Sequence, residues 1–467
     1  MADIFPNQLV EYLNTSPDYN DYEGEKQPEN LLKENPTLLY DFLLASAKMR
    51  LNPYPVYKFI RENTPIFYSN YLLGWFVSGY DFVQTIFKYK GVSANRGPML
   101  EKQLEKAHID AAILEQFPDY KTPSIIWADG KEHQTLKGIA NRGFTPKALK
   151  TYEETIKTSI QKVVAELKSR LKDDDNFDLY EGFAKVFPYR AITSIMGLPE
   201  EKYHTLMPDF RLTEQLFSGA GDDLKQTFIQ GNEAQLRIDA YFEKLAKARK
   251  ENPSDDMLSF LTGKEELLDQ KMGGETTKNE SAIKIAKLAA TLVIAGSTTL
   301  THQVPLALWA LAHNEEQFKL FRTLLEENDS KAIDNALEEL MRMDSTLQYT
   351  HRIATEDIQL GAETIKKGDV IILSIGAANH DPSHFSDNAD DLDLKRENAK
   401  EHFGFGHSAH HCIGRSLAKF EMEVAFRTLF NQFENLTLNP HLVAEPTMDT
   451  GAFKGFMKCP VMNPNLR

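Results

Sequence analysis

The stretch FGHSAHHCIG, residues 405–414, places a cysteine, Cys412, in a loop rich in glycine and histidine. Apolar residues then recur at three- and four-residue spacing: Leu417, Phe420 and Val424. This spacing predicts a helix from Arg415 onward. The free N–H groups and positive dipole end of such a helix stabilise a thiolate at its start. Gly414 lets the backbone approach a flat ligand or take a dihedral that other residues avoid. The stretch favours a thiolate placed to bond iron.

Two other interpretations of Cys412 stay open at this point. Cysteine is among the most buried residue types, so Cys412 can simply fill space as a small apolar side chain. The second interpretation is a metal site in which Cys412 joins nearby histidines: His402, His407, His410 and His411. It is the weaker one, because adjacent ligands rarely converge on one tetrahedral ion and the sequence has no Cys-x-x-Cys pair.

The composition is that of a globular protein with a sizeable core. The chain has 467 residues, of which 42% are hydrophobic and 26% charged, so extensive disorder is not expected. The formal net charge of −15 opposes binding to nucleic acid, because that affinity comes from Lys and Arg on phosphates. The two cysteines, Cys412 and Cys459, exclude a disulfide framework and favour a reducing compartment.

The sequence predicts neither a targeting segment nor a membrane anchor. Its first residues, MADIFPN, contain no basic leader and no apolar run, which argues against a signal peptide. The longest largely apolar run, 288–296, is shorter than the roughly 20 residues that a membrane-spanning helix needs. We therefore expect a cytoplasmic protein.

Helical spacing of apolar residues dominates the chain. It predicts helices over 147–172, 222–249, 281–313, 315–328 and 331–344. Short β-branched runs between turn signals predict a small sheet over 353–374. The polar stretch 251–281 is expected to be a surface connection without its own core, and residues 1–35 a partly ordered polar lead-in. The fold class is therefore mainly α with small β-sheets.

Small and hydroxyl-bearing residues interrupt the apolar helix predicted over 281–313. They are Ala295, Gly296, Ser297, Thr298 and Thr299. Thr299 can return its hydroxyl to the carbonyl group of Ala295. Together with Gly296 and Pro305, this bond predicts a bent helix that makes room for a ligand or water. The alternative is that Gly296 merely allows close helix packing and the threonines bond their own backbone.

Charged side chains stand at helical spacing elsewhere. Glu339 and Arg342 lie on one face of a predicted helix and can form a bidentate ion pair, although most such pairs are solvated surface bridges. Arg352, which leads into the predicted sheet, is placed to meet a carboxylate. His133 and Lys137 stand four residues apart at a predicted helix start and can form a second such clamp, although a solvated helix face is commoner.

Together these motifs resemble those of the cytochrome P-450 family, specifically the soluble bacterial kind. The family's haem loop, F-x-x-G-x-[HR]-x-C-x-G, is matched by Phe405, His410, Cys412 and Gly414, with Ser408 where glycine is usual. Its oxygen-binding helix, [AG]-G-x-[DE]-T, is matched by Ala295, Gly296 and Thr299, with Thr298 in the acid position. Its E-x-x-R pair is matched by Glu339 and Arg342, and its H-x-x-x-R contact by His133 with Lys137 for arginine.

The resemblance implies the cytochrome P-450 fold, with haem between the oxygen-binding helix and the cysteine loop, as a single domain over 36–467. It implies haem b with Cys412 as axial thiolate, whose electron donation favours O–O cleavage. The expected reaction inserts one atom of O₂ into a hydrophobic small molecule. The implied cofactor-binding residues are His133, Lys137, Arg352, Phe405, His410 and Gly414.

The resemblance also implies roles for the remaining motif residues. Thr299 would order protons, and Ala295 with Gly296 would form the oxygen groove. Glu339 and Arg342 would brace the fold near the proximal face of the haem. A substrate pocket would include Leu292, Tyr349, Thr350 and Phe453.

Thr298 departs from the family pattern, because a hydroxyl can pass a proton through water but cannot act as a charged acid or base. Three outcomes fit this departure: a monooxygenase with water or His302 in the proton relay, a peroxide-using oxygenase, and a nitric-oxide reductase type. A haem-based ligand sensor without turnover is an alternative of another class. The retained Thr299 favours catalysis.

Electrons are expected from a ferredoxin or flavodoxin with its reductase, because no flavin or iron–sulfur segment occurs in this sequence. By resemblance, four basic residues fall near the thiolate side: Lys137, Arg142, Arg415 and Lys419. They can attract an acidic partner despite the negative total charge. Simple solvation of these charges is the alternative.

Overall fold

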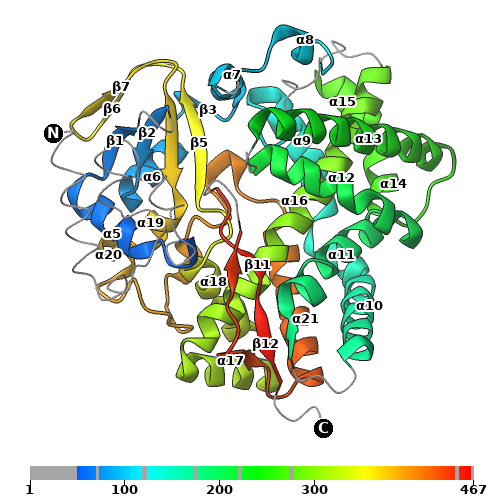
Figure 1. The fold of residues 1–467 in the computed structure, drawn as a ribbon. Helices are drawn as coiled ribbons and strands as arrows, with labels where there is room; N and C mark the ends of the chain where they lie inside the picture. The colour runs from blue at the N-terminus through cyan, green and yellow to red at the C-terminus, as the bar shows by residue number, and fades with distance from the viewer. Residues whose placement is uncertain are drawn as a thin grey trace. The chain divides into compact units, whose positions relative to one another are not determined.

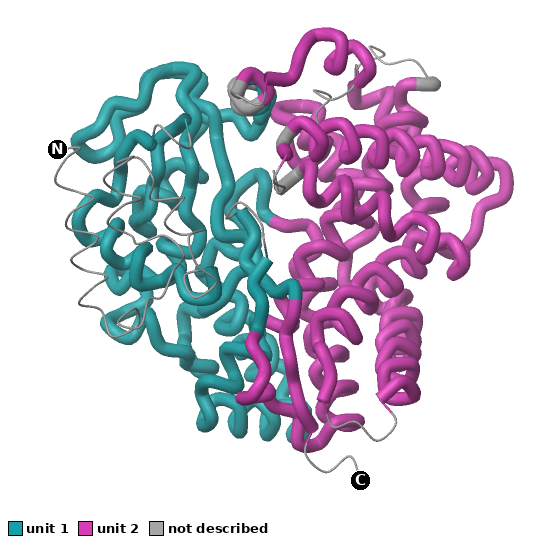
Figure 2. The backbone as a smooth tube through the Cα atoms, viewed as in Figure 1, with its two compact units in different colours: residues 1–102, 306–411, 444–457 teal, residues 103–305, 412–443, 458–467 magenta. Residues whose placement is uncertain are grey.

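The computed structural model describes residues 50–69, 73–106, 108–117, 124–171, 176–218, 223–272, 278–447 and 452–463. The lead-in predicted over 1–35 lies outside these residues. The chain divides into two compact units, coloured separately in Figure 2. Unit 1 comprises 1–102, 306–411 and 444–457, and unit 2 comprises 103–305, 412–443 and 458–467. The single domain over 36–467 stays a prediction.

Unit 1 is built on a five-stranded sheet with the strand order β1-β2-β8-β5-β3. The strands are β1 (Ile66–Ser69), β2 (Gly74–Val77), β3 (Val92–Ser93), β5 (Tyr349–Ala354) and β8 (Val370–Ser374). The β2–β8 pair is parallel, whereas the other pairs are antiparallel. All of β8 is buried, as expected of a strand covered on both faces. The sheet predicted over 353–374 is confirmed and extends back to Tyr349.

The described part of unit 1 also contains helices and small strands. The helices are α5 (Tyr54–Asn63), α6 (Tyr80–Lys88), α17 (Glu315–Glu327), α18 (Ser330–Met343), α19 (Ile375–Asn379), α20 (Pro382–Phe385), η3 (Ala399–Glu401) and η4 (Ser408–His410). The small strands are β6 (Ile358–Leu360), β7 (Glu363–Ile365), β10 (Glu445–Pro446) and β11 (Phe456–Lys458). Two apolar clusters form the core, one around Phe385 and Phe403 and one around Val56 and Phe76.

Unit 2 is mainly helical. Its helices are α8 (Ala111–Leu114), α9 (Gly130–Gly143), α10 (Pro146–Leu171), η2 (Tyr180–Ala184), α11 (Phe187–Ile195), α12 (Glu200–Ser218), α13 (Leu224–Glu251), α14 (Met257–Thr262), α15 (Glu265–Met272) and α21 (Arg415–Gln432). A small sheet has the order β4-β12-β9, with β4 (Asn176–Asp178), β9 (Thr437–Leu438) and β12 (Pro460–Met462). Helices α12 and α13 pack side by side (Figure 1). Helix α7 (Gly97–Lys106) begins in unit 1.

Helix α16 (Lys278–Ala312) runs without interruption through Gly296 and Pro305. Its segment Glu280–Ala312 is long and apolar enough to cross a membrane, but 61% of its most apolar window is buried inside the protein. The apolar stretch is thus longer than the predicted run 288–296. An apolar surface on all sides is typical of a helix in the core of a large protein.

The expectation of a coreless connection over 251–281 was wrong. Helices α14 and α15 occupy much of it, and their buried residues include Met257, Leu258, Leu261 and Leu268. Asp256 caps α14 by accepting the N–H of Ser259 at 2.7 Å. Each helix is too short for its apolar residues to show a clear period, so the polar residues dominated the pattern.

Candidate functional site

The cysteine loop ends as the sequence predicted, because α21 begins at Arg415 with Gly414 as its N-cap residue. The Cys412 side chain is exposed and forms no disulfide. Protein groups still crowd its wider surroundings, so desolvation raises the pKa of the thiol. The backbone N–H of Gly414, the charges of Lys137 and Arg415, and the Arg415 N–H oppose that rise. Burial outweighs these groups, so the pKa of the thiol stays above its usual value, and a bound metal ion would be needed to deprotonate it.

Two residues of the loop have left-handed backbone conformations, Gly406 with φ +67° and Ser408 with φ +58°. Ser408 thus takes the conformation that favours glycine, and its Oγ lies 2.8 Å from Nδ1 of His407. Gly414 has φ −82°, which any residue adopts, so the unusual dihedral expected there was wrong. A Cβ at Gly414 would have Sγ of Cys412 as its nearest contact, at 3.9 Å. A Cβ at position 414 would therefore meet no close protein atom, so packing within the protein does not require glycine here. The free space agrees with the expected approach of a flat ligand.

The histidines near the loop do not form a metal cluster. Nε2 of His402 lies 3.0 Å from the Glu338 carboxylate, and its Nδ1 accepts the N–H of Gly404 at 2.8 Å. Phe405 is buried beside the His402 ring, and His410 is half-buried in η4. The described part of the chain has no group of three His, Cys, Asp or Glu side chains suited to a metal ion. The alternative of a cysteine–histidine metal site is therefore unsupported.

Helix α9, in unit 2, carries the clamp predicted from His133 and Lys137. His133 is 5% exposed, and Lys137 follows one turn later and is half-buried. Desolvation lowers the pKa of Lys137, whereas the nearby Cys412 raises it. Glu132 accepts from Lys284 of α16 at 2.7 Å, which joins α9 to α16. The structure thus brings Lys137 close to the thiol, as the motif order suggested.

Helix α16 carries the predicted oxygen-binding residues. Thr299 Oγ1 donates to the carbonyl group of Ala295 at 3.2 Å, which confirms the predicted bond. Ala295 is exposed and Thr299 half-buried, whereas Thr298 is 4% exposed. A Cβ at Gly296 would lie 3.4 Å from Ile192 of α11, so this glycine also serves close helix packing. In unit 2, α16 therefore leaves Ala295 and Thr299 open to a ligand.

A group of cations in unit 1 surrounds the predicted Arg352. Arg352 is buried in β5, with its guanidinium 5.2 Å from the centre of the Phe87 ring. Burial, followed by the charges of Arg96 and Arg352, lowers the pKa of His351 to about 3. Arg96 and His351 were not among the predicted site residues. Arg96 comes near Arg352 because β3 pairs with β5, a pairing that no local pattern reveals.

Glu339 and Arg342 form a buried ion pair. Nε and Nη2 of Arg342 donate to the Glu339 carboxylate at 2.7 and 2.9 Å, and both side chains are 0% exposed. Arg396 donates to the same carboxylate at 3.1 Å. Further Arg342 donors reach the carbonyl groups of Asn379, Ala389 and Asp391 at 2.6 to 3.0 Å. The solvated-surface alternative was wrong, and Arg396 was missed because it lies 57 residues beyond Glu339.

The predicted pocket residues occupy different surroundings. Leu292 is buried on α16 in unit 2. In unit 1, the Tyr349 ring packs against the apolar core, so its side chain serves that core. Thr350 is half-buried and shares a face of β5 with Arg352. Phe453 is half-buried. Their role in binding a substrate stays a prediction.

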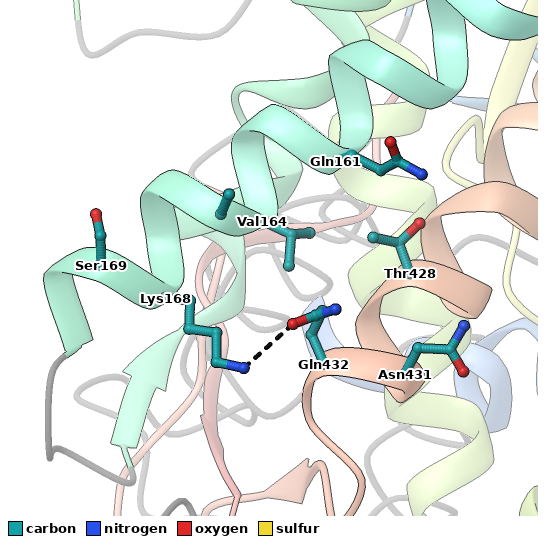
Figure 3. Close-up of a pocket in the computed structure, with 8 residues that line it drawn as sticks. Gln161, Val164, Lys168, Ser169, Thr428, Asn431 and Gln432 are labelled. Carbon is teal, nitrogen blue, oxygen red and sulfur yellow. Dashed lines mark hydrogen bonds between the residues drawn. The ribbon is translucent and has the colours of Figure 1, made fainter.

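An open groove of about 530 Å³ lies between α10 and α21 (Figure 3). Its lining residues are Gln161, Val164, Ala165, Lys168, Ser169, Thr428, Asn431 and Gln432. Lys168 Nζ donates to Oε1 of Gln432 at 3.2 Å. The groove contains none of the predicted site residues and lies along the C-terminal part of α21, whereas Cys412 precedes its start. It is separate from the candidate site.

These features define a class of protein: a mainly helical scaffold with a thiol before a helix start and cations beside it. The Cytochrome P450 family model matches residues 76–460, and the chain belongs to this family. Relatives in the family are named cytochrome P450 enzymes, which are monooxygenases, and the chain is an enzyme of this type. The family implies a haem cofactor with a thiolate ligand.

The relatives are bacterial. The chain is 29% identical over 399 residues to the biotin biosynthesis cytochrome P450 of Bacillus subtilis, covering 84% of this chain and 92% of that one. It is 30% identical over 356 residues to cytochrome P450 GfsF of Streptomyces halstedii, covering 76% and 80%. Among solved structures, P450BioI in complex with hexadec-9Z-enoic acid ligated acyl carrier protein has a TM-score of 0.74 at 27% identity, covering 90% of this chain and 100% of that one.

Proposed function

We propose that this enzyme binds haem b through Cys412 and inserts one atom of O₂ into a hydrophobic small molecule. The observation that carries the proposal is the setting of Cys412. Its thiol is exposed, precedes the start of α21, and lies near the N–H groups of Gly414 and Arg415 and the charge of Lys137. When bound, haem with such a ligand supplies the binding and activation of O₂.

The side chains that we propose to hold the cofactor are those of the family motifs. Cys412 would bond the iron, while Phe405 and Gly414 would lie against the haem. The cations proposed to neutralise the propionates are His133, Lys137, Arg352 and His410. Both His133 and Arg352 are buried, and their place in the family's motifs supports this role. Arg96 is a further candidate, because its charge acts at the same place as that of Arg352.

The remaining residues are proposed to shape and protect the reaction site. Thr299, which already bonds the backbone of Ala295, would hold a proton near the oxygen groove. Leu292, Thr350 and Phe453 would contribute to the pocket. The chain is similar to P450BioI, which was solved in complex with hexadec-9Z-enoic acid ligated acyl carrier protein. This similarity makes long-chain acids the first substrate class to test. Free hexadec-9Z-enoic acid and its carrier-protein conjugate would be titrated while the haem absorption band is followed.

Electrons are proposed to come from a ferredoxin or flavodoxin in the cytoplasm. The basic residues near the thiol, Lys137 and Arg415, offer a complementary surface for an acidic partner. Charge reversal of Arg415 and Lys419 is expected to slow reduction and to weaken its salt dependence. Reduction rates that are unchanged by both substitutions would contradict docking at this surface.

The haem proposal is tested by the absorption spectrum of the reduced protein under carbon monoxide. We expect a strongly red-shifted Soret band that is lost in Cys412→Ser. Cys459→Ala is the matched control, because Cys459 is buried and lies in unit 2 directly before β12. This control is expected to keep the band. A band that survives in Cys412→Ser would overturn the assignment of the ligand.

A further inference from the structure

Four residues on one side of α16 form the starting point. At about 100° per residue, Ala295, Thr298, Thr299 and His302 fall within roughly one third of the helix circumference. His302 follows Thr299 by three residues and Thr298 by four, so its ring lies one turn from both hydroxyls. Thr298 and His302 are each 4% exposed. A buried imidazole therefore stands next to the position where the family's acid is absent.

Two tyrosines enclose this buried pair. The Tyr189 hydroxyl lies 3.5 Å from Oγ1 of Thr298. Tyr180, in the π-helical turn η2, stacks on the His302 ring with centroids 5.6 Å apart and planes 10° apart. Burial, followed by the charge of Glu214, raises the pKa of both tyrosines. Both hydroxyls therefore keep their protons at neutral pH and act as fixed hydrogen-bonding groups.

Glu214 of α12 connects the pair to water. Its Oε1 lies 3.6 Å from Nε2 of His302. The Glu214 side chain is 23% exposed, whereas the His302 side chain is 5% exposed. Nδ1 of His302 is buried without a hydrogen-bond partner in the described part of the chain. Leaving a buried polar atom unpaired costs stability, so such an atom calls for an explanation.

Other charged groups act on the same place. Arg211 lowers the pKa of Tyr180 and Tyr189, whereas Glu181 and Asp178 raise that of Tyr180. None of these three is an ion-pair partner of His302 among the described residues. Glu214 is thus the carboxylate that the geometry joins to the imidazole.

We propose that Glu214 and His302 deliver protons to the hydroxyls of Thr298 and Thr299, and so replace the carboxylate that is absent at position 298. The inference rests on the proposed monooxygenase function. In one transfer, the Glu214 carboxylate takes a proton from water and gives it to Nε2 of His302, Nδ1 gives its proton to a threonine hydroxyl, and that hydroxyl passes its own proton to the reaction site. One proton enters and one leaves, so the net charge of these groups is unchanged.

The test measures which fraction of the supplied electrons ends in product and which in hydrogen peroxide. It uses the haem-containing full chain, a surrogate ferredoxin system and a substrate that shifts the haem spectrum. Glu214→Gln and His302→Gln are expected to lower this fraction about tenfold, with KM nearly unchanged. Glu201→Gln, an exposed carboxylate of the same helix, is the matched control and is expected to have no effect. Adding Thr298→Asp to Glu214→Gln is expected to restore most of the product.

A second measurement does not depend on turnover. Nitrogen-15 NMR of histidine-labelled protein reports which ring nitrogen carries the proton, and a neighbouring acceptor sets that distribution. Glu214→Gln is expected to change the distribution at His302, whereas Glu201→Gln leaves it as in the wild type.

The outcomes separate clearly. Unchanged product yield in both Glu214→Gln and His302→Gln overturns the relay. So does a loss that Thr298→Asp fails to restore and that leaves the His302 signals unchanged, because this pattern indicates a structural defect. Failure of the proposed function is different, since the wild-type protein itself would then show no haem-thiolate band.

Discussion

Two buried polar regions of this protein use their hydrogen-bonding groups in opposite ways. In unit 1, the Glu339 carboxylate is shared by Arg342 and Arg396, whose other donors reach backbone carbonyl groups. In unit 2, Nδ1 of His302, one turn from Thr298, and the Thr213 hydroxyl of α12 are buried without hydrogen-bond partners among the described residues. Fully bonded networks hold a fold in one arrangement, whereas unmet groups persist where function needs them. We therefore expect the first region to stabilise the fold and the second to take part in the proposed proton transfer.

The largest effect is expected from breaking the Glu339 network. Arg342→Ala leaves a carboxylate without its main partner at 0% exposure, so we expect a loss of about 3–5 kcal/mol in the free energy of unfolding. Denaturant unfolding measures this loss. Arg237→Ala is the control, since its pair with Asp209 is half-exposed and is expected to contribute only about 0–1 kcal/mol. Equal losses in the two variants would contradict the structural role.

A second prediction concerns His380, a buried histidine that lies between two hydrogen-bond acceptors. His380 is 1% exposed, and its nitrogens lie 3.0 Å from Asp390 and 2.9 Å from the Met343 carbonyl group. Desolvation lowers the pKa of His380. Because the unfolded chain then binds a proton more readily, the free energy of unfolding falls as pH drops below about 6.5, by at most about 1.4 kcal/mol per pH unit.

His380→Gln is expected to flatten this fall when unfolding is measured between neutral and mildly acidic pH. Its stability at neutral pH is lowered by the loss of packing, so the slope with pH is the quantity to compare. A slope identical to that of the wild type would show that His380 does not titrate on unfolding.

The smallest expected effect compares two threonines of unit 2. Thr213 is 0% exposed and its hydroxyl has no partner in the described residues, so Thr213→Val is expected to leave stability unchanged or to raise it by about 1 kcal/mol. Thr193 donates to the Tyr189 carbonyl group at 2.6 Å, so Thr193→Val is expected to lose about 1 kcal/mol. Thermal unfolding compares the pair. A loss of stability in Thr213→Val would mean that its hydroxyl is bonded after all.

Sequence patterns predicted the parts of this protein whose causes are local. Apolar periodicity predicted α10, α16 and α18 within a few residues, because burial of apolar residues repeats over several turns of each long helix. The start of α21 at Arg415 and the bond from Thr299 to Ala295 followed in the same way. Both features could be predicted because they depend only on residues three or four positions apart.

Features that depend on distant parts of the chain were not predictable. Arg396 reaches Glu339 across 57 residues, and Tyr189 reaches Thr298 across 109. No local pattern encodes these contacts, because they form only when distant segments of the chain pack together. The burial of Glu339 and Arg342 was hidden for the same reason, since spacing shows that two charges share a face but not whether that face meets water.

The way in which the two units share one chain has a consequence for biosynthesis. In unit 2, strand β4 at Asn176–Asp178 pairs with β12 at Pro460–Met462. A ribosome adds about 5–20 residues per second, so β4 waits tens of seconds for its partner. Much of unit 1 is synthesised in that interval, and β12 must arrive before unit 2 can close its small sheet. Residues 460–462 therefore complete a sheet whose first strand was synthesised almost 300 residues earlier.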